Sequence, residues 1–272
     1  MIRHDLIVYV VAVLCVSAWA EDAIKPAEKT LPMEGQVFAV EGHVAFLMPP
    51  PPEKRINPMP WVWYAPTLPG LPGEEERWMF ERFHAAGIAI AGIDVGESYG
   101  SPDGRAVYSA LYKELTENRG CAKKSCLLAR SRGGLMLYNW ACEHPDAVAG
   151  IAGIYPVCNL LSYPGVAKAC SAYRLSEAEL TAQLSSHNPI DRLAPLAKGK
   201  VPIFHIHGDA DTVVPLADNS GELARRYREL GGKIQLVIPE GQGHSMWPGF
   251  FQCQELVDFV IAVVANPLHE PK

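Results

Sequence analysis

The chain has 272 residues, a formal net charge of −6 and a hydrophobic content of 49%. That length and apolar content are enough for one α/β domain with a large core. The acidic balance, without any basic run, argues against a nucleic-acid partner. The excess of negative charge is too small to indicate disorder.

The first twenty residues have the pattern of a signal peptide. Arg3 supplies a positive charge, residues 6–16 form an unbroken apolar run, and residues 18–20 read A-W-A, an A-x-A cleavage site. The run is shorter than the roughly 20 residues that span a membrane. We therefore expect residues 1–20 to be removed and residues 21–272 to form a single secreted or periplasmic domain without a stable membrane anchor. An uncleaved signal anchor is the alternative.

Export would place the cysteines in an oxidising compartment, where disulfides form. Six cysteines follow the predicted signal peptide: Cys121, Cys126, Cys142, Cys158, Cys170 and Cys253. Their number alone does not choose among the 15 possible pairings, but Cys158 and Cys170 flank one loop-rich segment and are the first pair we expect. Buried free thiols are the alternative. The sequence has no C-x-x-C or histidine-rich metal spacing, so we expect no metal.

The predicted elements alternate between strands and helices along the chain. Strands are expected at 36–40, 43–48, 61–64, 88–93, 148–154, 201–206 and 234–238, with one more directly before Ser131. Helices are expected at 74–86, 105–117, 221–230 and 252–264, with one more directly after Ser131. This alternation predicts an α/β fold whose mostly parallel sheet is covered by helices on both faces. Residues 155–200 interrupt the pattern with turns and one helical patch.

Ser131 stands where an apolar run changes into a helical pattern. Ala129 and Gly133 are the small residues two positions to either side. This spacing is typical of a nucleophile elbow, a sharp strand–turn–helix junction that exposes the serine hydroxyl at a helix N-terminus, where backbone N–H groups stabilise an oxyanion. A helix N-cap before a glycine-rich turn is the alternative for an isolated match.

Two further polar loops follow predicted strands. Asp211 lies in an H-G-x-x-D-x-x-V-P segment at 207–215, and His244 ends a G-x-G-H loop at 241–244. A serine nucleophile needs a base within hydrogen-bond reach and an acid that orients the base. Because sites in parallel sheets form at the carboxyl ends of strands, we expect these groups to meet there. Asp209 is the alternative acid, which we expect to shape the turn instead.

The elbow and these two loops, in the order Ser, Asp, His, resemble the α/β-hydrolase superfamily, within its esterase, dienelactone-hydrolase-like and prolyl-oligopeptidase-like branches. The resemblance covers residues 61–265, with alanine in place of the elbow's first glycine. It implies an α/β-hydrolase fold, with Ser131 as nucleophile, His244 as base and Asp211 as acid. It also implies that residues 155–200 form a small cap over the site.

An oxyanion hole in this superfamily uses two backbone donors. The resemblance assigns one to the Arg132 amide and the other to the loop after strand 61–64, at Thr67 or Leu68, although the family's H-G-G-G-type motif is missing there. The Ser-Arg pair also resembles that of glucuronoyl esterases, which implies that the Arg132 guanidinium lies near the oxyanion. A surface arginine paired with a carboxylate is the alternative.

Four further residues are candidates for contact with substrate. Glu97, Ser98 and Tyr99 follow a buried strand, and Trp247 follows the predicted base. A satisfied turn network is the alternative for the first three. The G-E-S-Y-G around Ser98 has the form of an elbow, but the S-P-D-G after it breaks the helical pattern, so we reject Ser98 as nucleophile. Core packing is expected for Trp61, Trp63 and Trp140.

These observations predict a secreted serine hydrolase that cleaves a carboxylic ester through an acyl-enzyme. Its substrate is expected to be a small-molecule or carbohydrate-linked ester, and no cofactor is expected. A prolyl-oligopeptidase-like peptidase is the first alternative, disfavoured because the sequence leaves no room for a large gating domain. A catalytically silent α/β-hydrolase-fold binding protein is the second, disfavoured by the intact Ser, Asp and His set.

Overall fold

The computed structural model describes residues 28–265, so the predicted signal peptide lies outside the described residues. Within them the centre is an eight-stranded sheet of order β1-β2-β4-β3-β5-β6-β7-β8. The strands are β1 (Gln36–Val40), β2 (His43–Met48), β3 (Trp61–Tyr64), β4 (Ala89–Ile93), β5 (Ser125–Arg130), β6 (Val148–Ile154), β7 (Ile203–Ile206) and β8 (Ile234–Val237). The β1–β2 and β2–β4 pairs are antiparallel and the others parallel. This is the predicted α/β-hydrolase fold.

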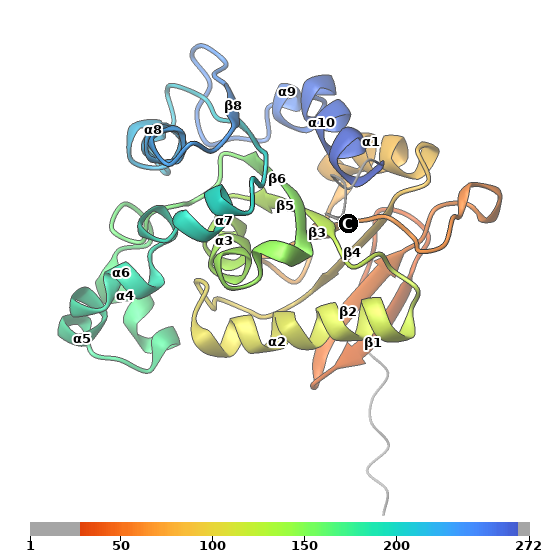
Figure 1. Ribbon diagram of the computed structural model, residues 1–272, viewed down its shortest axis with the longest axis horizontal. Helices are drawn as coiled ribbons and strands as arrows, with labels where there is room; N and C mark the ends of the chain where they lie inside the picture. Colours follow the sequence, from red (N-terminus) through yellow and green to blue (C-terminus); the bar gives the residue numbers. More distant parts are fainter. Residues whose placement is uncertain (1–27, 266–272) are drawn as a thin grey trace, which may run out of the picture.

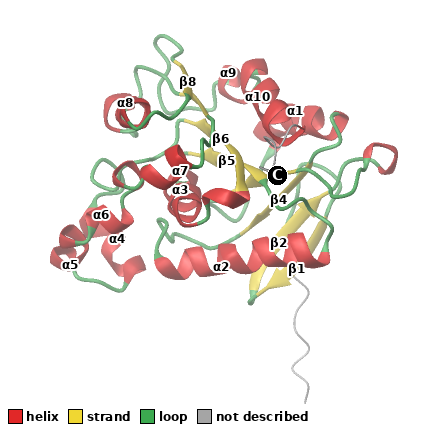
Figure 2. Ribbon diagram, in the orientation of Figure 1, coloured by secondary structure: helices red, strands yellow, loops and turns green. Residues whose placement is uncertain are grey.

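Helices cover both faces of the sheet (Figures 1 and 2). The longer helices are α1 (Glu74–Ala85), α2 (Pro102–Lys113), α3 (Gly133–Glu143), α8 (Ser220–Glu229) and α10 (Gln254–Ala265). The shorter ones are α4 (Val166–Ala169), α5 (Glu177–Ala182), α6 (Leu184–His187), α7 (Ala194–Lys198) and α9 (Pro248–Phe251). Side chains of α1, α9 and α10 pack on one face, and those of α2, α3, α7 and α8 pack on the other.

Successive side chains of β3 point to opposite faces of the sheet, so the strand contributes to the apolar cores on both faces. Trp61 and Trp63 point to the α3 face, where their rings stack with centroids 5.2 Å apart and Trp63 lies 4.6 Å from Trp140. Val62 and Tyr64 point to the opposite face, toward α1. The three tryptophans are fully buried, which confirms their predicted core role.

Within the described chain, the segment Pro248–Ala265 is the one stretch long and apolar enough to cross a membrane by length and composition. In this structure its larger part, α10, packs against β5, β6 and β7. Its buried face consists of Leu256, Val257, Val260 and Val264. The apolar character of the segment therefore serves the core.

One predicted helix begins earlier than expected. The S-P-D-G segment does not break the chain, because α2 starts at Pro102. Ser101 is its N-cap, with the Oγ atom accepting a hydrogen bond from the Gly104 amide at 3.4 Å. A capping serine followed by proline in the first turn is a start signal, since proline lacks the N–H that would be unpaired there.

The expected disulfide was wrong. All six described cysteines have free thiols. The Cys158 thiol points to the Pro156 carbonyl at 3.5 Å, and the Cys170 thiol points to the Ala167 carbonyl at 3.3 Å. The physical reason is orientation, since the two thiols of the expected pair point to different backbone carbonyls. Cys121, Cys126, Cys142 and Cys158 are buried and pack as small apolar residues. Burial also raises the pKa of Cys121 and Cys142 to about 12.

Residues 155–200 form the small insertion, which contains α4 to α7. In Figure 1 α4, α5 and α6 lie at the lower left, and α7 lies beside α3. The insertion has its own apolar cluster, in which Val157, Leu160 and Tyr173 pack with Leu135 of α3. Tyr163 from the same segment reaches the pocket described below. The insertion thus contributes to the wall of the site.

Candidate active site

Ser131 occupies the sharp turn between β5 and α3. Its φ of 47° lies in the left-handed region, which is strained for a residue with a side chain. Three backbone hydrogen bonds hold the turn: Ser131 N–H donates to the Ile154 carbonyl at 3.1 Å, and the Ser131 carbonyl accepts from Gly134 at 2.9 Å and Val157 at 2.8 Å. This over-determined turn has the geometry expected of a nucleophile elbow.

Small residues allow the elbow to pack closely. A Cβ atom on Gly133 would lie 3.2 Å from the Ala65 carbonyl oxygen. A Cβ atom on Gly134 would overlap the Val157 carbonyl oxygen and lie 2.8 Å from the Val157 nitrogen. The sequence pattern singled out Gly133, but Gly134 is the position that excludes any side chain.

Ser131, His244 and Asp211 form one hydrogen-bonded line at the carboxyl ends of the strands. The Ser131 Oγ atom lies 3.0 Å from His244 Nε2, and His244 Nδ1 lies 2.7 Å from Asp211 Oδ2. Because a carboxylate only accepts, Nδ1 carries the proton and Nε2 is free to accept the serine proton. The line has the geometry of a nucleophile, a base and an orienting acid.

The environment of Asp211 keeps it ionised. Burial opposes the charge, but hydrogen bonds from His207, the Val214 amide and His244 outweigh it and lower the pKa of Asp211 to about 2. Its Oδ1 atom accepts from the amides of Val213 at 2.9 Å and Val214 at 2.8 Å.

Asp209, the alternative acid, lies elsewhere in the same loop. Its Oδ1 atom accepts a hydrogen bond from the Gly241 amide at 2.7 Å. Asp209 therefore connects the Asp211 loop to the His244 loop, and Asp211 alone of the two aspartates contacts His244.

A buried ion pair lies next to the Ser131 turn. Arg130, directly before Ser131, donates to the carboxylate of Glu76 from α1, and the Tyr64 hydroxyl donates to the same Glu76 oxygen at 2.8 Å. The other end of the guanidinium donates to the Met246 sulfur at 2.9 Å. The pair thus links β3, β5, α1 and the loop of the base.

Sequence reasoning missed Arg130, Glu76 and Tyr155. The Tyr155 ring lies 4.3 Å from the His244 ring, measured between centroids, and forms one wall for the base. A charged residue in an otherwise apolar strand next to the nucleophile was the available signal for Arg130. Nothing local identifies Glu76 as its partner.

Three residues beside Ser131 have backbone amides without a hydrogen-bond acceptor among the described residues. Thr67, Leu68 and Arg132 line the same pocket as Ser131. No described residue accepts a hydrogen bond from the amide of any of the three. These free N–H groups are therefore available as the two donors of an oxyanion hole.

The Arg132 side chain bridges three segments around the pocket. Its guanidinium pairs with Glu97 at 3.2 Å and donates to the Thr67 carbonyl and the Tyr163 hydroxyl, each at 3.4 Å. The arginine therefore has the carboxylate partner of the alternative interpretation and also lines the pocket beside Ser131.

Of the three substrate-contact candidates after β4, one contacts a residue of the Ser131 pocket and two form hydrogen bonds elsewhere. Glu97 approaches the site through Arg132, but the Ser98 Oγ atom accepts from the Gly100 amide at 3.5 Å and, among described residues, bonds no histidine. Tyr99 is buried, and its carbonyl accepts from the Tyr173 hydroxyl at 2.8 Å. Ser98 and Tyr99 thus belong to a turn network.

Trp247 lies beside the pocket. Its ring packs on Phe250 with centroids 5.2 Å apart, and it is not among the described residues that line the cavity at Ser131. The preceding residue, Met246, does line that cavity.

The pocket at Ser131 has a volume of about 310 Å³. Three exposed apolar residues are among those that line it: Leu68, Val213 and Met246, with exposed fractions of 54%, 50% and 54%. We call these three residues the apolar rim. Clustered exposed apolar groups at a pocket are typical of a ligand site. Among the described residues, no group of three His, Cys, Asp or Glu side chains is placed to hold a metal ion.

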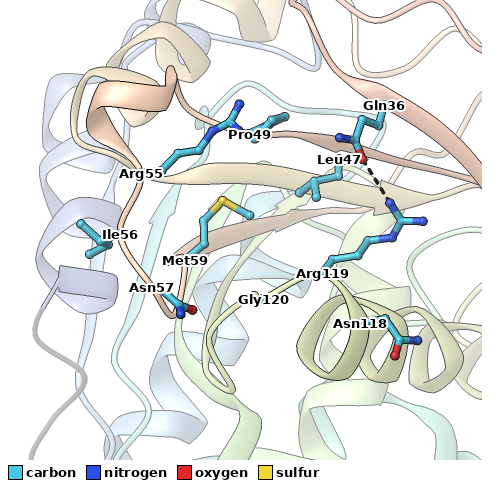
Figure 3. Close-up of a pocket in the computed structure, with 10 residues that line it drawn as sticks. All are labelled: Gln36, Leu47, Pro49, Arg55, Ile56, Asn57, Met59, Asn118, Arg119 and Gly120. Carbon is cyan, nitrogen blue, oxygen red and sulfur yellow. Dashed lines mark hydrogen bonds between the residues drawn. The ribbon is translucent and has the colours of Figure 1, made fainter.

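A second hollow, of about 400 Å³, lies near the amino ends of β3 and β5 (Figure 3). Arg119 crosses it and donates to the Gln36 side chain at 3.1 Å, and Met59 and Asn57 form its wall. Its ten lining residues include arginines but no serine, histidine or carboxylate. It therefore lacks the groups for acyl transfer and lies at the opposite end of the sheet from Ser131.

The fold and the Ser131 site define an α/β-hydrolase of the serine hydrolase type. Residues 109–261 match the model of the prolyl oligopeptidase family, Peptidase S9. The match covers more than half of the chain, and this protein belongs to that family. No curated protein matches the sequence.

Solved structures show the same fold at low sequence identity. MPT51 (FbpC1) of Mycobacterium tuberculosis has a TM-score of 0.68 at 12% identity, with 85% of this chain and 99% of that chain covered. Est1E from Butyrivibrio proteoclasticus has a TM-score of 0.64 at 15% identity, with 86% and 100% covered. A puromycin-hydrolyzing peptidase of Mycobacterium tuberculosis has a TM-score of 0.65 at 16% identity, with 85% of this chain covered. This chain spans only 39% of that peptidase.

Proposed function

We propose that this protein hydrolyses a small carboxylic ester through an acyl-enzyme on Ser131. The observation that carries the proposal is the unbroken line from Ser131 Oγ through His244 to Asp211, with contacts of 3.0 and 2.7 Å. The proposed substrates are small-molecule or carbohydrate-linked esters, and the residues described here supply every group that the reaction needs.

The proposed reaction has two halves. In the first, His244 Nε2 takes the Ser131 proton as Oγ bonds to the acyl carbon, and the oxyanion meets the amides of Arg132 and of Thr67 or Leu68. The C–O bond to the alcohol then breaks, and His244 returns the proton to the leaving oxygen. In the second half water is deprotonated by His244 and attacks the acyl carbon. The acid leaves as Ser131 regains its proton.

The size of the pocket supports a small ester. Its volume of about 310 Å³ lies at the lower end of the roughly 300–1,000 Å³ range of small-molecule sites. A separate observation concerns length: the structural matches cover 99% of MPT51 and 100% of Est1E. Membership of the prolyl oligopeptidase family favours a second candidate, a peptidase with the same triad.

Two assays on the purified protein test the proposal. A fluorophosphonate should add covalently to Ser131, as shown by intact mass and peptide mapping, whereas a silent binding protein should not react. Matched p-nitrophenyl acetate and acyl-p-nitroanilide substrates should then give a higher kcat/KM for the ester. Labelling combined with a preference for prolyl peptide amides would favour the peptidase, and no labelling would refute both.

We also propose that the protein acts outside the cytoplasm, on the evidence of residues 1–20 alone. N-terminal sequencing of the protein made in a cell with an export pathway should begin at residue 21. A chain that begins at residue 1 in the cytoplasmic fraction would refute this proposal and leave the enzymatic one intact.

A further inference from the structure

A series of buried hydrogen bonds leads from Tyr138 of α3, through His205 of β7, toward the Asp211 loop. The Tyr138 hydroxyl lies 2.7 Å from His205 Nε2, and His205 Nδ1 lies 2.9 Å from the Ser220 Oγ atom. The same Oγ atom lies 2.8 Å from His207 Nδ1. All four side chains are fully buried. Buried polar groups that are fully paired hold one arrangement of the core.

The last residue of this hydrogen-bonded series, His207, contacts Asp211. His207 Nε2 lies 2.8 Å from the Val214 carbonyl and 3.3 Å from Asp211 Oδ2. Both of these atoms are acceptors, so Nε2 must carry a proton. The donor is shared between the carbonyl that fixes the loop and the carboxylate that faces His244.

The direction of every other hydrogen bond follows from that proton. A His207 ring with its one proton at Nε2 accepts from the Ser220 hydroxyl at Nδ1. The Ser220 oxygen then accepts from His205 Nδ1–H, and His205 Nε2 accepts from the Tyr138 hydroxyl. Each proton between Tyr138 and His207 Nδ1 then has one acceptor, and the His207 Nε2 proton is shared between the Val214 carbonyl and Asp211 Oδ2. The two histidines therefore have opposite tautomers.

The state of His205 agrees with this direction. Burial, followed by the neighbouring His207, lowers the pKa of His205 to about 3. Its ring is therefore neutral around neutral pH, which leaves Nε2 free to accept from Tyr138.

The chain completes the set of donors around the carboxylate. Asp211 Oδ2 receives His244 Nδ1–H at 2.7 Å and His207 Nε2–H at 3.3 Å. Asp211 Oδ1 receives the amides of Val213 and Val214. Donors on both oxygens prevent rotation of the carboxylate, so Oδ2 stays aimed at His244.

We infer that His207 is a positioning residue for Asp211, and that Ser220, His205 and Tyr138 fix the tautomer in which it can act. The inference rests on the proposed function, because the group it positions is the acid of that reaction. His207 is not among the residues that line the Ser131 pocket, and its contact with the proposed triad is through Asp211.

The variant Ser220→Ala tests the link with little disturbance of the fold. Ser220 is the first residue of α8, where alanine is tolerated, and the change leaves His207 Nδ1 without its donor. A loosened acid should lower kcat by about 10- to 100-fold, the effect of a small misplacement in an active site, with KM unchanged. The rate of fluorophosphonate labelling of Ser131 should fall by a similar factor.

Ser125→Ala is the matched control. Ser125 is also fully buried, but its Oγ atom has no hydrogen-bond partner among residues 28–265, and it lies at the start of β5. Ser125→Ala should keep wild-type kcat and labelling rate. Equal rates in folded Ser220→Ala and Ser125→Ala would overturn the inference.

Nitrogen-15 NMR of the histidine rings gives a second test that needs no substrate. At neutral pH, the wild-type spectrum should show His205 as a neutral ring protonated at Nδ1, and His207 protonated at Nε2. Tyr138→Phe should perturb the His205 ring first, because it loses its donor. The reverse tautomers, or a charged His205, would overturn the inference even if esters are hydrolysed. Failure of every ester with these tautomers present and Ser131 labelling intact would instead refute the proposed function.

Discussion

The pair between Arg130 and Glu76 should dominate the stability of the elbow. Glu76 is fully buried and the Arg130 side chain is 7% exposed, so Glu76→Gln leaves a guanidinium charge in the core without its counter-charge. Breaking a buried pair in this way costs about 3–5 kcal/mol. The free energy of unfolding, measured by urea denaturation, should fall by that amount, and activity should fall as well because Arg130 immediately precedes Ser131.

Glu81→Gln on the same helix provides the comparison. Glu81 pairs with Arg77 at 3.0 Å, but its side chain is 52% exposed. A surface pair contributes at most about 1 kcal/mol, so this variant should unfold close to the wild type. Equal destabilisation by Glu76→Gln and Glu81→Gln would refute the view that burial makes the Arg130 pair important.

Three further predictions follow from the same geometry. Gly134→Ala should prevent folding or abolish activity because its Cβ atom overlaps the Val157 carbonyl, whereas Gly70→Ala meets no atom within 4 Å and should be silent, as circular dichroism would show. Met246→Ser, in the apolar rim, should lower kcat/KM for a butyrate ester more than for an acetate ester, whereas Leu230→Ser, 50% exposed, should affect neither. Asp211 has a pKa of about 2 in the fold, below its ordinary value of 3.8. It should stabilise the fold by about 2 kcal/mol at higher pH, and this stability should be lost as the pH falls from about 4 to 2. Asp211→Asn should remove that part of the acid dependence in urea titrations.

Most of the architecture could be predicted because its signals are local. Alternating or continuous apolar runs marked the strands, and β1, β2, β3 and β6 begin and end where the sequence indicated. Ser131, Asp211 and His244 each stand in a short motif directly after a strand, and the parallel sheet brings such positions to one edge.

The features that the sequence did not predict depend on tertiary contacts. Arg130 and Glu76 are 54 residues apart, and no pattern in either segment identifies the other. The chain from Tyr138 to His207 likewise joins a helix, a strand and a second helix that meet only in the fold. The disulfide prediction was wrong because an oxidising compartment only permits thiols to oxidise. A disulfide also requires two thiols to face each other at bonding distance, which the sequence does not show.

The central claim is that Ser131 is the nucleophile, and the kcat of Ser131→Ala beside Ser98→Ala tests it most directly. The two serines stand in similar short motifs, but only Ser131 contacts His244. We predict that Ser131→Ala loses a factor of about 10⁴ or more in kcat on an ester that the wild type hydrolyses, while Ser98→Ala stays near the wild-type rate. Wild-type turnover in folded Ser131→Ala would contradict the account.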